Sequence, residues 1–165
     1  MNALHIDSHA TLDWVKPHPF RREYELWLSK DLVGILKFSQ DDKCLTIAES
    51  ADGKWFFRGT RYINPRVSIW TQIHDYVAAF EGSQTGKGNL RFLDGRNYRW
   101  EYKDQMQMDW VFIDSVGKPI LCFKPASGRG KVRGKLEITP AATGIRQLPM
   151  LCLLGWNIVI LFGEL

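Results

Sequence analysis

The hydrophobic positions of this chain come in short runs rich in Val, Ile, Phe, Tyr and Trp, from about residue 10 to residue 139. Gly and Asp separate the runs at intervals of about ten residues, which is typical of β-strands joined by turns. The pattern predicts twelve strands, over residues 11–15, 24–29, 32–38, 43–49, 54–61, 66–73, 76–82, 88–93, 97–102, 108–114, 119–124 and 132–139.

Three of the connections between these runs have the residues of tight turns. Glycine lies inside the segments ADGK (51–54), LDGR (93–96) and SVGKP (115–119). Glycine adopts the positive φ that tight hairpins require. Neighbouring strands are therefore expected to be antiparallel and joined as an up-and-down meander.

One of these hairpins makes a specific prediction about charge. If residues 94–96 form a three-residue loop, Phe92 lies opposite Tyr98 and one face of the ribbon is aromatic. The other face then places Arg91 directly across from Arg99, and like charges in direct opposition are unfavourable. Either the two side chains splay into water or an anion lies near them.

The last apolar run, Leu148–Phe162, contains a single polar side chain, Asn157. As a helix it would span ~22 Å, which is short of the hydrocarbon core of a bilayer at about 30 Å. Only residues 163–165 follow it, without the Lys and Arg cluster that flanks membrane-spanning helices. A membrane anchor remains the alternative to a buried helix.

A helix that is apolar all round must be buried all round. A closed barrel of twelve antiparallel strands is too wide for its own side chains to fill, and it can enclose a helix. We therefore expect a mainly β fold, a closed antiparallel barrel of about twelve strands with the hydrophobic C-terminal helix as its central plug. Residues 1–165 form one domain in this interpretation, with residues 1–10 as a flexible tail.

This organisation resembles the tubby C-terminal-like fold, which tubby proteins, phospholipid scramblases and LURP-one-related proteins share. The resemblance is carried by the hairpin WVFIDSVGKPILCFK (110–124) and by the closing segment LPMLCLLGWNIVILF (148–162). It implies a plugged barrel and, by analogy with tubby proteins, binding of phosphoinositide headgroups. The chain has no cysteine-rich palmitoylation cluster or calcium-ligand loop, so the resemblance does not imply lipid scrambling.

Composition and charge narrow the classes of function. Hydrophobic residues make up 45% of the chain and seven are Trp, which excludes a disordered chain. The net charge of +4 permits an anionic partner such as phospholipid, although an ordinary soluble surface carries a similar charge. Cys44, Cys122 and Cys152 show no C-x-x-C spacing, and the N-terminus lacks a secretory pattern, so we expect a cytoplasmic protein.

The strongest candidate for a binding site is the segment 124–135, in which five cations alternate with small residues. Backbone amides and charged side chains of such a loop can converge on phosphate oxygens. A solvated basic hairpin is the alternative. The candidate anion- or lipid-binding residues are Lys124, Arg129, Lys131, Arg133 and Lys135, joined by Arg91 and Arg99.

Other chemistry has weaker support. His5, Asp7 and His9 would share one face of an extended strand and could hold a metal, but a solvated tail at the terminus is the favoured interpretation. The glycine-rich segment 82–88 departs from a phosphate-binding loop in spacing and in lacking Ser or Thr after Lys87. We therefore expect no catalytic residues, no metal and no cofactor.

The sequence thus predicts a non-enzymatic binding module that is cytoplasmic or peripheral to a membrane, with anionic phospholipid as its partner and no transmembrane span. A soluble interaction or regulatory domain with a protein partner is the first alternative, and an exposed aromatic patch would favour it. A small-molecule or metal-dependent enzyme is the second, and a concave pocket with perturbed ionisable groups would favour that one. No readout motif for nucleic acid is present.

Overall fold

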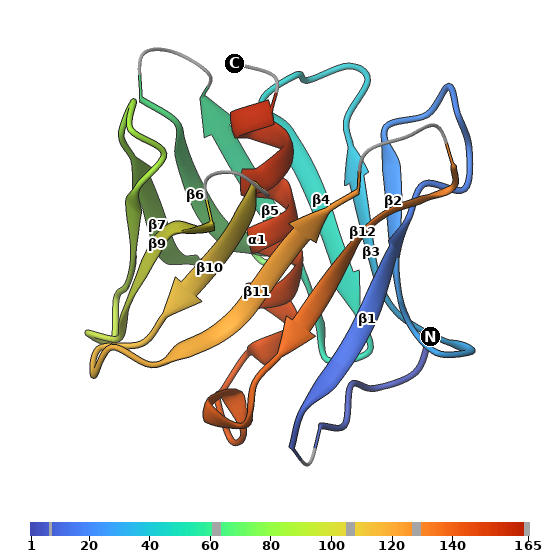
Figure 1. Cartoon of the computed structure of the whole chain (residues 1–165). Helices are drawn as coiled ribbons and strands as arrows, with labels where there is room; N and C mark the ends of the chain where they lie inside the picture. The colour runs from blue at the N-terminus through green and yellow to red at the C-terminus, as the bar shows by residue number, and fades with distance from the viewer. Residues whose placement is uncertain (7, 61–63, 105–107, 127–129, 164–165) are drawn as a thin grey trace.

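The computed structural model is a closed barrel of twelve antiparallel strands around one helix (Figure 1). It describes residues 1–6, 8–60, 64–104, 108–126 and 130–163. The strands are β1 Ala10–Val15, β2 Glu23–Leu28, β3 Asp31–Phe38, β4 Leu45–Ser50, β5 Gly53–Thr60, β6 Arg66–Thr71, β7 Tyr76–Gly82, β8 Gly88–Phe92, β9 Asn97–Asp104, β10 Asp109–Ile113, β11 Pro119–Pro125 and β12 Val132–Ile138. A 3₁₀ turn, η1 (Pro140–Ala142), precedes the helix α1 (Leu148–Gly163).

The strands follow one another around the barrel in sequence order, and the last closes on the first. In that closing pair Ala10 lies opposite Ile138 and Leu12 opposite Leu136. Closure leaves no exposed sheet edge, which removes a route to aggregation. The predicted fold class and its twelve strands are confirmed.

The helix α1 runs through the middle of the barrel, as the apolar closing segment predicted. Twelve of its sixteen residues are buried, and the buried set covers every side of the helix. Within the described part of the chain, no helix combines the length and hydropathy that a bilayer crossing needs. The plug interpretation is therefore confirmed over the membrane anchor.

Aromatic side chains on the inner face of the barrel pack against α1. Trp14 of β1 stacks on Trp156 of the helix, with ring centroids 5.2 Å apart and planes 10° apart. Gly134 of β12 makes room for the same indole, because a Cβ at that position would lie 2.8 Å from the ring of Trp156. The helix and the wall interlock at specific positions, as close-packed protein interiors do.

The single polar side chain of the plug has a partner in the wall. Asn157 is 2% exposed, and its Nδ2 donates a hydrogen bond of 3.1 Å to Oγ1 of Thr46, which is also buried. Other rotations of α1 would leave this amide unpaired in an apolar interior, at a cost of about 1–3 kcal/mol. This hydrogen bond therefore helps to fix how the helix faces the strands.

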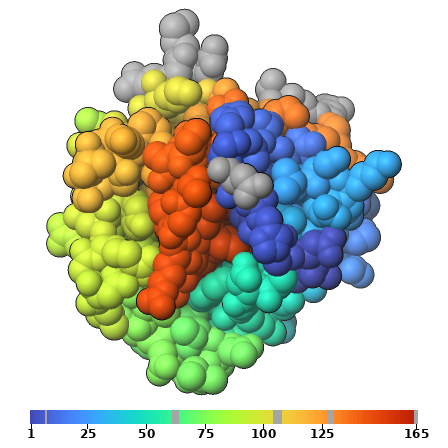
Figure 2. All heavy atoms as spheres, turned by 90° about the horizontal axis from the view of Figure 1, so that it is seen from below, coloured from blue at the N-terminus to red at the C-terminus, as the bar shows by residue number. Residues whose placement is uncertain are grey.

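The barrel end where α1 begins is covered by the segment 139–147. Nη1 of Arg96 donates to the backbone oxygen of Arg146 at 3.2 Å, and its Nη2 donates to Oε1 of Gln147 at 3.4 Å. Figure 2 looks onto this end and shows the orange segment filling its middle. These hydrogen bonds hold the entry to α1 against the β8–β9 hairpin.

The N-terminal residues, expected to form a flexible tail, lie against the barrel. The amide N of Asn2 donates to the backbone oxygen of Leu32 at 2.9 Å, and its Nδ2 donates to Oδ1 of Asp31 at 2.8 Å. Leu4 and Ile6 pack against the core. A flexible tail would make none of these contacts. The burial of Leu4 and Ile6 explains why this segment lies against the barrel.

The contact between α1 and β11 gives a direct test of the plug. A Cβ on Gly155 would overlap the ring of Phe123, whereas a Cβ on Gly163 would meet no atom within 4 Å. Alanine normally stabilises a helix relative to glycine by about 1 kcal/mol. We expect Gly155→Ala to lower the free energy of unfolding by about 1–3 kcal/mol in urea denaturation, because overpacking outweighs helix propensity.

Gly163→Ala is the matched control, and it should leave the free energy of unfolding unchanged or slightly raised. Phe123→Leu in the Gly155→Ala background should restore part of the loss, since it removes the ring that causes the overlap. A stabilising Gly155→Ala would mean that α1 is not packed against β11.

The three thiols provide a second test, by reactivity. Cys44 is exposed, whereas Cys122 and Cys152 are buried. Burial raises the pKa of the Cys122 thiol, and also that of Cys152, so neither forms the reactive thiolate readily. We expect one thiol to react with Ellman's reagent in the native protein and three in denaturant, with Cys44→Ser abolishing the native reaction. Rapid native modification of Cys152 would contradict the enclosed helix.

Candidate functional site

Half of the candidate segment 124–135 is strand. It comprises the end of β11, the hairpin connection and the first four residues of β12. Lys124 and Lys135 lie on the two strands, directly opposite each other. Arg129 lies outside the described residues.

Two of the candidate cations are neutralised by carboxylates on the outer face. Nζ of Lys124 lies 2.9 Å from Oε1 of Glu137, and Nζ of Lys135 lies 2.8 Å from Oδ1 of Asp13. The hydrogen bond between Lys124 and Glu137 raises the pKa of the lysine and lowers that of the carboxyl. Each lysine is thus paired with a carboxylate of opposite charge, and these two lysines contribute little net positive field.

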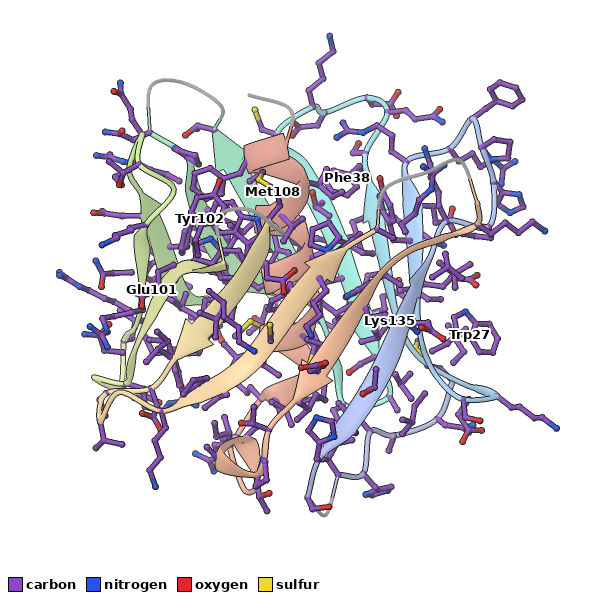
Figure 3. The ribbon with its side chains drawn as sticks, viewed as in Figure 1. Trp27, Phe38, Glu101, Tyr102, Met108 and Lys135 are labelled. Atoms are coloured by element: carbon purple, nitrogen blue, oxygen red, sulfur yellow. The ribbon has the colours of Figure 1, made fainter. Side chains whose placement is uncertain are left out.

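The second pair belongs to a row of side chains across the outer surface. Lys135 is in register with Asp13, and Asp13 with Trp27 of β2. Figure 3 shows Lys135 on the outside of the wall and Trp27 projecting away from the barrel. Nε1 of Trp27 donates to Oε2 of Glu25 at 2.9 Å, so its polar group is satisfied on its own strand.

Lys131 and Arg133 flank the start of β12. Lys131 is exposed and forms no ion pair with any described residue. Arg133 is half-buried, and its Nε has no hydrogen-bond partner among the described residues. These two cations, unlike Lys124 and Lys135, keep their charge available to an anion.

The β8–β9 hairpin differs from the predicted register by two residues. Arg91 lies opposite Asn97, and Arg99 lies opposite Asn89, so the two arginines are diagonal neighbours. The reason is the turn: Gly95 has φ 94°, and Arg96 joins the ladder by accepting a hydrogen bond of 2.9 Å from the amide of Phe92. The expected direct opposition of the two arginines is therefore wrong. The aromatic face survives, because a shift of two residues keeps each side chain on its side.

Arg91 and Arg99 line a groove of about 620 Å³ on the outer face of β7, β8 and β9. The groove also contains Glu81 and Glu101, so its charge is mixed. Neither arginine forms an ion pair with a residue that the structure describes.

The seven candidate residues do not form one site. Arg99 is in register with Ile113, and Ile113 with Pro119 at the start of β11. Lys124 lies near the other end of β11, beside the β11–β12 hairpin. The two arginines thus lie on a different part of the wall from the remaining cations.

The structure instead brings a second basic segment to the β11–β12 hairpin. The β1–β2 connection reads KPHPFRR over residues 16–22. The amide of Lys16 donates a hydrogen bond of 2.8 Å to the backbone oxygen of Lys131, which ties the two hairpins together. Figure 1 shows both at the barrel end where α1 finishes. We call residues 16–22 and 126–133 the basic rim.

The basic rim concentrates the positive charge of the protein. It contains six Lys and Arg residues and no Asp or Glu. The whole chain has 22 basic and 18 acidic residues. If these six are left out, acidic residues outnumber basic ones by two, so the net positive charge of the chain comes from these two connections. Like-charged side chains on adjacent loops repel one another, so the arrangement favours a bound anion or anionic surface.

Sequence reasoning overlooked the 16–22 part of this rim. Its signal was an aromatic residue, Phe20, between Pro19 and a pair of arginines, in a connection without Asp or Glu that ends where Glu23 begins β2. Phe20 is 97% exposed in the folded chain. Arg22 is held in place, with its guanidinium carbon 4.5 Å from the ring centroid of Phe38.

An aromatic groove lies elsewhere on the wall, over β4, β5 and β6. It measures about 360 Å³ and is lined by Leu45, Phe56, Arg58, Trp70 and His74. Phe56 and His74 stack with centroids 6.2 Å apart. Half-buried aromatic rings of this kind are common at protein interfaces.

A third hollow, of about 650 Å³, lies at the end where α1 begins, between residues 4–6, the β4–β5 turn and residues 142–149. Among the described residues, no three His, Cys, Asp or Glu side chains are placed to hold a metal ion. Asp7, the middle member of the His5-Asp7-His9 set, lies outside the described residues.

Comparisons of the chain with protein-family models, with curated proteins and with solved structures find no match.

Proposed function

We propose that this chain is a non-enzymatic module that docks peripherally on an anionic phospholipid surface through its basic rim. The observation that carries the proposal is the joining of two hairpins with six cations and no carboxylates by the hydrogen bond between Lys16 and Lys131. The resemblance to tubby-like proteins supports the same class of ligand.

The energetics suit reversible binding. Each Lys or Arg near an anionic leaflet contributes about 1 kcal/mol, and the interaction weakens over a Debye length of about 8 Å at physiological salt. The cations of the basic rim that the structure describes, Lys16, Arg21, Arg22, Lys131 and Arg133, therefore give several kcal/mol at low salt and much less at high salt. The helix α1 takes no part, because it is enclosed by the barrel.

Charge reversal on the rim tests the proposal. We expect Arg21→Glu/Lys131→Glu to reduce partition onto vesicles of phosphatidylcholine with phosphatidylserine by at least about ten-fold in flotation, because two attractive charges become repulsive. Both residues are exposed, so the fold should be unaffected.

The matched control is Lys30→Glu/Lys118→Glu, which makes the same change of charge on exposed turns at the opposite end of the barrel. It should retain most of the binding. Equal loss in the two double variants would show a dependence on net charge alone, and equal flotation of the wild type with pure phosphatidylcholine would remove the headgroup interaction.

A protein partner is the second candidate, and the aromatic groove favours it. Trp70 is half-buried, with its ring 5.2 Å from that of Tyr76, and its Nε1 already donates to Ser68 at 2.9 Å. A partner could therefore cover the indole without leaving its N–H unpaired. A buried Trp at an interface typically contributes about 2 kcal/mol or more.

If a protein partner binds the aromatic groove, the immobilised wild-type chain should retain it. The Trp70→Ser variant should lose that partner, because its affinity for the partner should be at least about thirty-fold weaker. Trp27→Ser removes an outward tryptophan from a different part of the wall and should leave retention unchanged. Retention that is insensitive to Trp70 but lost with Arg21→Glu/Lys131→Glu would assign the partner to the basic rim instead.

A further inference from the structure

The tip of the β1–β2 hairpin presents an aromatic side chain to solvent. At 97% exposure, Phe20 is the most exposed of the large hydrophobic side chains that the structure describes, and the only aromatic one among those that are mostly exposed. Single exposed apolar residues are common on soluble proteins and need no function. What distinguishes Phe20 is the chemistry of its surroundings.

The flanks of Phe20 are complementary to anionic headgroups. Residues 16–22 contain three Lys and Arg residues and one His, with no acid. A ring at the acyl boundary would therefore have cations at the level of the phosphates, which is the arrangement of interfacial membrane anchors.

Three other exposed apolar turns lack this complementarity. They lie at the opposite end of the barrel, and each has an aspartate within two residues. A carboxylate so close to the bilayer would be repelled by anionic lipid and would lose hydration. The three turns are those of Ile73, Leu93 and Val116, beside Asp75, Asp94 and Asp114.

The hairpin is held in shape before any ligand binds. Pro17 and Pro19 restrict the backbone on the approach to the tip. The amide of Phe38 donates to the backbone oxygen of Arg22 at 2.9 Å, beside the stacking of the same arginine on the Phe38 ring. With the tie between Lys16 and Lys131, these contacts reduce the entropy that docking would otherwise cost.

Two more apolar side chains are exposed at the same barrel end. Val132, next to Lys131, is 48% exposed, and Met108 of the β9–β10 hairpin is 52% exposed. Figure 3 shows Met108 at the end where α1 finishes. Val132 adds apolar surface within the basic rim, whereas Met108 lies on a different hairpin and is followed by Asp109.

We propose that Phe20 inserts into the boundary between headgroups and acyl chains of an anionic bilayer, with the cations of the basic rim on the surrounding phosphates. This inference rests on the proposed function and adds to it an orientation: the barrel docks with the β1–β2 hairpin toward the lipid, and its opposite end faces away.

The test places a polarity-sensitive fluorophore on Phe20→Cys in a Cys44→Ser background, where the two remaining native thiols are buried. With vesicles of phosphatidylcholine and phosphatidylserine, we expect a blue shift and quenching by lipids brominated near the headgroup end of the acyl chain. The same label on Val116→Cys, an exposed turn at the opposite end, should show neither.

A label-free measurement accompanies it. Phe20→Ser should weaken partition onto these vesicles by about ten-fold, Phe20→Trp should retain it, and Val116→Ser should leave it unchanged. The residual binding of Phe20→Ser should be more sensitive to salt, because only the electrostatic part remains.

The outcomes separate the two proposals. Wild-type protein that binds anionic vesicles while the label on residue 20 stays in water, with full binding by Phe20→Ser, would overturn insertion and leave electrostatic docking intact. Wild-type protein that ignores anionic vesicles would overturn both. A blue shift that is equally strong on neutral vesicles would show apolar adsorption and overturn the role of the surrounding cations.

Discussion

The structure depends on the enclosure of one helix that is apolar on every side. Water would surround such a helix at a large cost, and α1 avoids it because twelve strands close around it. The barrel depends equally on α1, since a ring of that size cannot be filled by its own side chains. The stacking of Trp14 on Trp156 and the hydrogen bond from Asn157 to Thr46 make this mutual dependence specific in rotation and depth.

A filled interior restricts where the protein can bind anything large. Grooves on the wall and loops at the two ends are what remain, and the two ends differ in chemistry. At the end where α1 finishes, two tied hairpins carry cations around an exposed phenylalanine. At the other end, the segment 139–147 covers the start of α1, and exposed aliphatic turns lie beside aspartates. Under the proposed docking, this difference would turn the β1–β2 hairpin toward the anionic surface.

The outer wall shows why a count of cations misjudges a basic segment. Lys124 and Lys135 face each other across two strands, which alone would be unfavourable. Each is neutralised by a carboxylate, Glu137 in one case and Asp13 in the other. In the same segment, Lys131 on the connection and Arg133 at the start of β12 remain available, and residues 126–133 contain no Asp or Glu. Whether a cation can attract an anionic ligand therefore depends on whether it already forms an ion pair, and the number of Lys and Arg residues in a segment does not reveal this.

The sequence by itself determined the strands, their antiparallel order and the buried plug, because turn residues, short apolar runs and an all-apolar closing segment are local signals. It did not determine the register of the β8–β9 hairpin, since two alignments that differ by two residues bury the same faces. Only the tertiary structure decided the site. The barrel closes between β1 and β12, and this closure creates both the ion pair of Asp13 with Lys135 and the hydrogen bond between Lys16 and Lys131. The residues of each pair are more than a hundred positions apart in the chain, so no local sequence pattern encodes these contacts.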